Sequence, residues 1–185
     1  MKSLSSPVQT VVTVLAGVAM WVQGCSLSEI PDVGRTDMDR RAVIKADDKT
    51  VGDILAAFNQ AEEALHARDI DALMEVYARD YHYRDLMKDD VRKIWESLFA
   101  KYSQISSTHV FSQVVAEGRK PSTAKITCTG RLWGTSKESG ERVILDSWFF
   151  EVHHLVSEEG AWRVRGVPGE PPEALGLPVT PHPFF

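Results

Sequence analysis

The feature that most constrains the fold is a change of hydrophobic period near Ser106. Before this point apolar residues recur about every 3.6 residues, as on one face of an α-helix, and after it they alternate with polar residues, as in a strand with one wet face. The alternation is clearest over residues 124–132. Helices followed by strands predict an α+β domain in which the helices pack on one face of a curved antiparallel sheet.

Three amphipathic helices are predicted before the change of period. The first begins at a capping box formed by Thr50 and Asp53 and continues to about Ala67. Asp69 caps a second, shorter helix, and a third helix begins near Asp89. Each helix has its apolar stripe on one side only, so each is expected to pack against a partner surface.

Four strands are predicted from the alternation, over residues 108–116, 124–132, 142–156 and 161–167. The segments TSKESGE and SEEG between the later strands are rich in turn residues and are expected to close antiparallel hairpins.

The N-terminal 24 residues have the features of a secretion signal: Lys2 is followed by a nearly unbroken apolar run from Val11 to Val22. A run of about 12 residues is shorter than the roughly 20 that a membrane-spanning helix needs. The sequence QGC that follows resembles the lipobox of bacterial lipoproteins, which implies that Cys25 is lipidated and becomes the first mature residue. The alternative is an ordinary signal peptide with an incidental cysteine.

Two polar segments flank the predicted domain, which covers residues 50–167. Residues 25–49 are charged and without a sustained period, and they predict a tether between the lipid anchor and the domain. Residues 168–185 are rich in proline, which interrupts strand pairing, and they predict an exposed tail. We therefore expect a protein of the bacterial cell envelope, anchored through Cys25 on the periplasmic or outer-membrane side.

Composition excludes some classes of partner. The net charge is −5 and there is no Lys/Arg stripe, so nucleic acid is not an expected partner. His153 and His154 are neighbours on a predicted strand and point to opposite faces, so no metal site is predicted, and no cofactor is expected. Cys128 has no predicted disulfide partner and is interpreted as a small buried apolar residue.

Two segments carry a resemblance to a known family. The order of elements, with ALHARDIDALMEVYARDYHY near the start and EEGAWRV near the end, resembles the nuclear transport factor 2-like superfamily. That superfamily includes ketosteroid isomerases and SnoaL-type polyketide cyclases, and the resemblance covers roughly residues 50–167. It implies that helices and sheet form a cone whose open end is commonly a ligand pocket.

The resemblance places Asp85 at the position of the isomerase general base. The isomerase also needs two hydrogen-bond donors for the enolate oxygen, and these positions fall at Ala61 and Val152, which cannot donate. Leu86 stands where a proline usually follows the base. Steroid isomerisation is therefore not expected.

The strand over residues 142–156 has two possible registers, which exchange all side chains between its faces. The hairpin match makes the even-numbered residues face inward: Asp146, Trp148, Phe150, Val152, His154 and Val156. The other register turns Leu145, Phe149 and Leu155 inward instead. The even register predicts a ligand pocket lined by Tyr83, Asp85, Asp146, Trp148, Phe150 and His154.

Three functions are compatible with these patterns. The favoured one is a non-enzymatic domain that binds a small apolar molecule or a protein partner. The second is an isomerase, dehydratase or cyclase in which Asp85 and His154 act as acid and base, against the alternative that Asp85 lies in solvent and His154 is a hydrogen-bonded core residue. The third is a scaffold that forms a homodimer through the sheet. Polar groups deep in the cone would favour an enzyme, and a filled cone with an exposed apolar sheet face would favour a scaffold.

Overall fold

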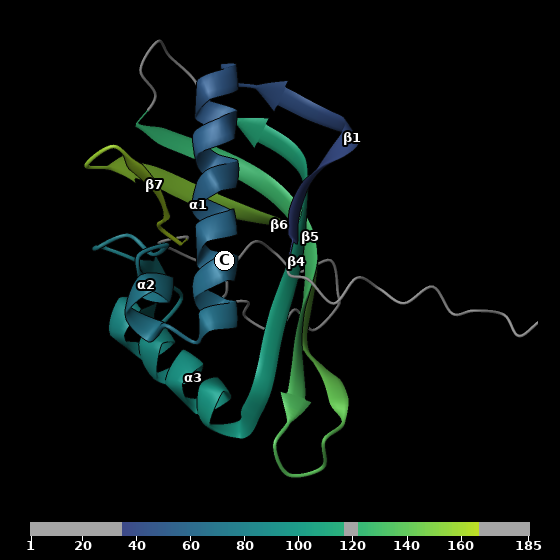
Figure 1. Ribbon diagram of the computed structural model, residues 1–185. Coiled ribbons are helices and arrows are strands. Elements are labelled where there is room, and N and C mark those ends of the chain that lie inside the picture. Colours follow the sequence, from purple (N-terminus) through teal and green to yellow (C-terminus); the bar gives the residue numbers. More distant parts are fainter. Residues whose placement is uncertain (1–34, 117–121, 167–185) are drawn as a thin grey trace, which may run out of the picture. The chain divides into compact units, whose positions relative to one another are not determined.

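The computed structural model describes residues 35–116 and 122–166 of the chain (Figure 1). Within them, five strands form one sheet in the order β1-β4-β5-β6-β7. The strands are β1 (Arg35–Lys45), β4 (Tyr102–Val115), β5 (Thr123–Ser136), β6 (Arg142–Glu158) and β7 (Ala161–Val164). The helices are α1 (Asp48–Ala67), α2 (Ile70–Met74) and α3 (Lys88–Lys101), and a short hairpin of β2 (His82–Tyr83) and β3 (Leu86–Met87) precedes α3.

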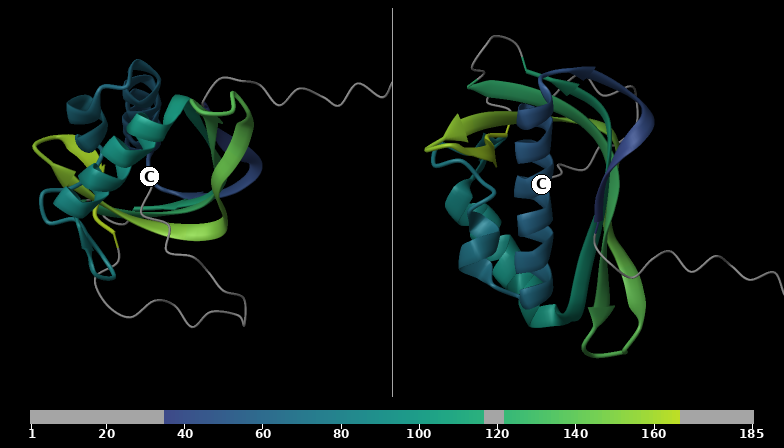
Figure 2. Two further views of the ribbon diagram at one scale, coloured as in Figure 1. Left: turned by 90° about the horizontal axis from the view of Figure 1, so that it is seen from below. Right: turned by 45° about the horizontal axis from the view of Figure 1, so that its top comes forward.

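The sheet is curved, and the three helices lie on its concave side (Figures 1 and 2). Strands β4 to β7 pair antiparallel, as predicted, but β1 pairs parallel to β4, so the sheet is mixed. Because β1 precedes α1, the helices are not the N-terminal elements of the domain. The α+β class is confirmed, and the purely antiparallel sheet is not.

Strand β1 corrects the predicted tether. Residues 35–45 belong to the sheet, so the prediction of a polar tether over residues 25–49 is wrong for this part. The strand has few apolar residues because it is an edge strand, and its pairing with β4 is interrupted by an irregularity between Met38 and Val43. Backbone hydrogen bonds to β4 hold it, and these leave no apolar pattern in the sequence.

The helix starts are close to the predicted positions. The N-cap of α1 is Asp47, whose carboxylate accepts from the Thr50 N–H at 2.9 Å, so the predicted capping box starting at Thr50 is wrong. A carboxylate is a better acceptor for the first N–H groups than a threonine hydroxyl, and Thr50 donates its own hydroxyl to Asp47. The Asp69 cap of α2 is confirmed by its bond from the Ala72 N–H.

Large aromatic side chains fill the space between helices and sheet. Phe58, Tyr77, Trp95 and Phe111 have no exposed surface, and the Trp95 indole N–H donates to the Tyr77 hydroxyl at 2.9 Å. Phe58 packs edge-on against Phe111, with ring centroids 5.0 Å apart. The predicted inward packing of the α3 stripe is confirmed at Trp95.

Strand β6 contains two bulges relative to β5, and these decide the register that the sequence left open. Thr129 of β5 faces both Phe149 and Phe150, and Leu145 is an extra residue between Ile144 and Asp146. Phe150 has a left-handed backbone with φ of 53°. Asp146 and Trp148, between the two bulges, therefore face the concave side, as the even register predicts, whereas beyond the second bulge the odd-numbered residues 151, 153 and 155 face it. Before the first bulge Ile144 pairs with Trp133 and faces the convex side, so the even register is right only between the bulges.

In residues 35–116 and 122–166, no helix has the length and apolar character required to cross a membrane. The predicted signal peptide, Cys25, residues 25–34 of the tether and the tail over residues 168–185 lie outside the described residues.

Candidate functional site

A chain of polar side chains crosses the concave side of the sheet. Glu62 on α1 projects from the helix face that covers β4, where Ser107 and His109 lie on the same face of the strand. The Ser107 hydroxyl and its backbone N–H both donate to the Glu62 carboxylate, the second at 3.3 Å. The Ser107 Oγ also lies 2.9 Å from His109 Nε2, and that nitrogen lies 3.4 Å from Glu62 Oε1.

The other side of the imidazole faces a thiol. His109 Nδ1 lies 3.6 Å from the Sγ of Cys128 on β5, and the Trp148 indole N–H donates to the same sulfur at 3.4 Å. Cys128 is fully buried, as predicted, but it is part of a hydrogen-bonded chain as well as of the apolar core. We call Glu62, Ser107, His109, Cys128 and Trp148 the buried polar chain.

Burial and hydrogen bonding act on His109 in opposite directions. Burial alone would lower the pKa of this imidazole, but its interactions with Cys128 and Glu62 outweigh burial and raise the pKa to about 9. This shift favours the protonated imidazole at neutral pH, with Nε2 facing the Glu62 carboxylate.

The arrangement of carboxylate, imidazole and thiol resembles that of a nucleophile with its base and orienting group. Glu62, His109 and Cys128 are, however, at most 3% exposed. Reactive cysteines lie in partly exposed surroundings, whereas buried ones are inert. The buried polar chain is consequently better suited to holding α1 against β4 and β5 than to attacking a substrate.

A second polar cluster lies further along the concave face of β6. Glu151 pairs with Cys128 and so points to the concave side, where the Tyr83 hydroxyl donates to its carboxylate at 3.4 Å. Burial raises the pKa of Glu151, although Tyr83 and the guanidinium of Arg84 oppose this effect. Asp146 adds a nearby negative charge that also raises it. A half-buried carboxyl group of this kind can accept or donate a proton.

The structure places three of the six predicted pocket residues near this cluster. Tyr83 and Trp148 are buried, and Asp146 is half-buried on the same side of β6. Glu151 was missed because the predicted even register turned it outward. The sequence feature that could have revealed Glu151 is the pair Phe149 and Phe150. Two consecutive large apolar residues do not fit a strand with one solvent-exposed face unless a bulge lies between them.

The other three predicted pocket residues lie elsewhere, which corrects the predicted acid–base pair. Asp85 is exposed in the turn between β2 and β3. His154 lies opposite Lys125 on the convex face of the sheet, and burial followed by the nearby Lys125 lowers its pKa. Phe150 is 70% exposed. In the described residues no hydrogen bond or ion pair joins Asp85 to His154.

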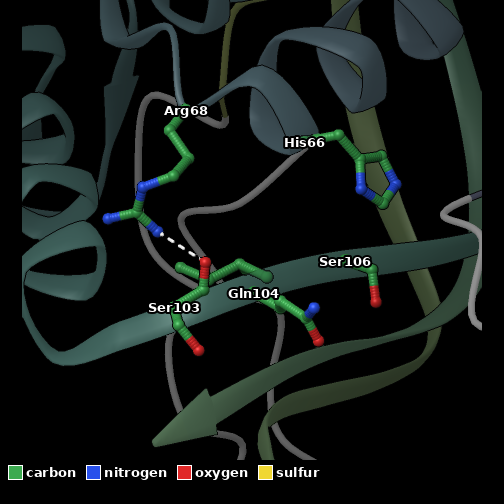
Figure 3. A pocket seen from close by; sticks show the side chains of 6 residues that line it. His66, Arg68, Ser103, Gln104 and Ser106 are labelled. Carbon is green, nitrogen blue, oxygen red and sulfur yellow. Dashed lines mark hydrogen bonds between the residues drawn. The ribbon is translucent and has the colours of Figure 1, made fainter. Parts of the chain in front are cut away.

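A small groove opens beside the last turn of α1 and the start of β4 (Figure 3). Its volume is about 270 Å³, and it is lined by His66, Arg68, Ser103, Gln104, Ile105 and Ser106. The Arg68 guanidinium donates to the carbonyls of Tyr102, at 2.7 Å, of Ser103 and of Phe99. These bonds join α1 to the end of α3, so the only cation among the lining residues already serves a structural role.

The convex face of the sheet carries exposed apolar side chains. Phe149 and Phe150 are 66% and 70% exposed, Ile144 is 52% exposed, and Val152 and Val110 are also exposed. Val110 pairs with Thr129, the residue that faces both phenylalanines, so these side chains are neighbours across β4, β5 and β6. We call Val110, Ile144, Phe149, Phe150 and Val152 the convex apolar patch.

No family model and no curated protein matches the sequence. Solved structures do match. A conserved protein from Planctomyces limnophilus superposes with a TM-score of 0.54 and 12% identity, over 65% of this chain and 94% of that chain. A proposed aromatic ring hydroxylase from Novosphingobium aromaticivorans has a TM-score of 0.52 and 17% identity, over 66% of this chain and 88% of that chain.

A third similar structure is a proposed scytalone dehydratase from Novosphingobium aromaticivorans, with a TM-score of 0.51 and 12% identity, over 64% of this chain and 80% of that chain. Identities this low establish the fold alone. The domain has the nuclear transport factor 2-like fold, and the fold implied by the sequence resemblance is confirmed.

Proposed function

We propose that this chain is a lipid-anchored protein-interaction domain of the bacterial cell envelope, which binds a protein partner through the convex side of its sheet. The observation that carries the proposal is the exposure of Phe149 and Phe150, two adjacent phenylalanines on one bulge of β6. The lipid anchor at Cys25 rests on the sequence and supplies the membrane attachment.

Adjacent exposed aromatic rings on one face of a sheet contribute binding energy when a partner covers them. A phenylalanine buries about 150–250 Å² when it is fully covered, and apolar area contributes roughly 25 cal/mol per Å². Two such rings can therefore contribute several kcal/mol to an interface. Phe150 also holds a left-handed backbone that non-glycine residues rarely adopt, and this keeps its ring on the convex side.

The concave side supports a binding domain over an enzyme. The groups of the buried polar chain satisfy one another, and the aromatic residues around them leave Phe58, His109 and Cys128 without exposed surface. Two of the similar structures are proposed enzymes, but the acid–base pair suggested for this chain, Asp85 with His154, is not assembled.

A second candidate function is the binding of a small ligand at the concave cluster around Glu151. It is favoured by one observation, the half-buried carboxyl group whose pKa is raised by burial beside Tyr83. Titration of Glu151 by NMR tests it, with Glu151→Gln used to assign the resonance. An ordinary pKa for Glu151 would remove the support for this candidate.

Photo-cross-linking in membranes tests the protein-interaction function. The full-length chain carries a benzophenone amino acid in place of Phe149, and a matched chain carries it in place of Glu96, an exposed residue of α3. We expect a discrete cross-linked product from position 149 and none from position 96. Phe150→Asn should reduce the yield, because asparagine tolerates the left-handed backbone but removes the ring. A chain that gives no product at position 149 would contradict the proposal.

A further inference from the structure

The convex side of the sheet carries three exposed cations beside the convex apolar patch. Lys125 and Arg131 alternate along β5 with residues whose side chains are buried on the concave side. Arg142 lies on the same face of β6 as Ile144, and its guanidinium is placed over the Trp133 ring, 5.0 Å from the centroid. We call Lys125, Arg131 and Arg142 the convex cations.

The carboxylates of these strands lie on the other side of the sheet. Strands β4 and β5 contain no acidic residue. Before it pairs with β7, β6 contains two, Asp146 and Glu151, and these lie opposite Leu132 and Cys128 of the buried concave side. Across β4, the next carboxylate is Asp37 of the edge strand β1, which pairs with Val110. The middle of the convex side is therefore cationic, although the whole chain has 26 acidic and 21 basic residues.

Many cations elsewhere on the described surface have a counter-charge within the chain. On the helical side, for example, the Arg92 guanidinium lies 2.6 Å from the Asp71 carboxylate. In the described part of the chain, neither Lys125 nor Arg131 forms an ion pair with a carboxylate. An acidic chain that leaves two cations without a counter-charge beside exposed aromatic rings is complementary to the carboxylates of another molecule.

Polar side chains separate the apolar residues of this face. Phe149 and Phe150 face Thr129, and Val152 lies opposite Thr127, whose hydroxyl donates to the Gln113 side chain at 3.3 Å. Such polar groups are costly to transfer into the hydrocarbon of a bilayer. A mixture of aromatic, polar and cationic side chains is instead typical of protein–protein interfaces.

We propose that the partner that covers the convex apolar patch is a segment of a different protein, in which carboxylates flank apolar side chains. This inference rests on the proposed protein-interaction function and names the chemistry of the partner. Lys125 and Arg131 are separated by about 20 Å along β5. Thr129, which faces both phenylalanines, lies between them. The carboxylates of the segment contact the two cations, and its apolar side chains cover the phenylalanine rings.

The same charges disfavour contact between the convex faces of two copies of this chain. Such an interface would bring the convex cations of one copy against those of the other, and like charges across an interface oppose association. A different protein that supplies carboxylates avoids this repulsion.

Charge reversal combined with the cross-link at position 149 tests the inference. The full-length chain with benzophenone at this position is compared, in membranes, with the same chain carrying Lys125→Glu and Arg131→Glu. We expect the reversal to reduce the yield of cross-linked product roughly tenfold, because it replaces two favourable ion pairs by repulsion. Added salt should also reduce the yield from the chain without the reversal, since exposed charges are screened.

The matched control is Lys93→Glu, which reverses an exposed charge on α3, on the concave side of the sheet (Figure 2). It should leave the yield unchanged. The charge-preserving pair Lys125→Arg and Arg131→Lys should keep most of the yield. Native tryptophan fluorescence in each variant shows that a lost product does not come from unfolding.

Mass spectrometry then identifies the cross-linked segment. We expect aspartate or glutamate within a few residues on both sides of the attachment point. The inference is overturned if the segment lacks carboxylates, if charge reversal leaves the yield unchanged, or if the attached protein is a second copy of this chain.

These outcomes can be told apart from a failure of the proposed function. A charge-independent product with another protein leaves the protein-interaction function standing and removes only the acidic partner. If position 149 attaches to phospholipid alone, or gives no product, the proposed function itself fails.

Discussion

The imidazole Nε2 of His109 lies 3.4 Å from the carboxylate Oε1 of Glu62, and both side chains are buried. This pair connects the middle of β4 to the last half of α1 through the apolar core. A charged pair in such surroundings is stable only while both partners keep their charges.

The first prediction concerns the dependence of stability on pH. The pKa of His109 is raised to about 9 in the folded protein, from 6.5 in an unfolded chain. Its contribution is fully present below about pH 6.5 and is lost as the pH rises through about 9. We expect the free energy of unfolding, measured with urea, to fall by on the order of 3 kcal/mol over this range.

The variant His109→Gln provides the control for this prediction. Without the titrating imidazole, the decline between pH 6.5 and 9 should be much smaller, whatever the absolute stability of the variant. If the free energy of unfolding falls equally in the wild-type protein and in His109→Gln, titrating groups other than His109 cause the loss of stability.

The second prediction is that Glu62→Gln lowers the pKa of His109. Glutamine keeps the size of the side chain but removes the negative charge that favours the imidazolium, and burial then favours the neutral ring. NMR titration of the His109 ring protons measures this directly. Glu63→Gln, an exposed neighbour on α1, should leave the pKa unchanged. A pKa near 9 in Glu62→Gln would show that Cys128 alone sustains the charge.

Most of the fold could be predicted from hydrophobic period, because the one-sided stripes of α1 and α3 and the alternation of β5 follow directly from which face each element buries. Strand β1 could not be predicted, since its stability comes from backbone pairing with β4 and not from an apolar pattern. The bulges of β6 could not be located either. Their positions depend on the pairing with β5, and this pairing decides whether Glu151 or Val152 faces inward.

The buried polar chain lay beyond what one sequence can show. Glu62 belongs to an EE pair in a helix, where a carboxylate is usually solvated, and its partner His109 is 47 positions further along the chain. Only the packing of α1 on β4 reveals that the helix turns Glu62 inward and Glu63 outward.

The third prediction separates the observed helix cap from the one expected from sequence. Asp47→Ala removes the acceptor of the Thr50 N–H and should reduce the free energy of unfolding by about 1 kcal/mol. Asp53→Ala, which disrupts the capping box expected from the sequence, removes only an exposed ion pair with Lys49 and should change stability by less than about 0.5 kcal/mol. If denaturant unfolding shows a larger loss of stability for Asp53→Ala than for Asp47→Ala, Thr50 is the N-cap and the capping box expected from the sequence is present.

The fourth prediction compares two glycines. A Cβ at Gly130 would collide with the Thr108 carbonyl and the Trp148 ring, so Gly130→Ala should destabilise the protein by about 1–3 kcal/mol. A Cβ at Gly52 in α1 meets nothing, and Gly52→Ala should stabilise by up to about 1 kcal/mol because alanine favours the helix. Thermal unfolding of both variants measures the difference. A neutral Gly130→Ala would mean that Trp148 moves readily, and its contact with Cys128 would then be loose.

The last prediction is that Cys25 carries the lipid and is the first residue of the mature chain. Its basis is the short apolar run that ends in QGC, since a run of about 12 residues inserts too weakly to hold the chain by itself. Mass spectrometry of protein extracted from membranes should find an acylated N-terminal cysteine. Cys25→Ser should release the chain from membranes, whereas Cys128→Ser should not, because Cys128 is buried in the core. A Cys25→Ser chain that remains in the membrane fraction would show that Cys25 is not the membrane anchor. The proposed location in the cell envelope would then lose its support from the lipobox-like sequence.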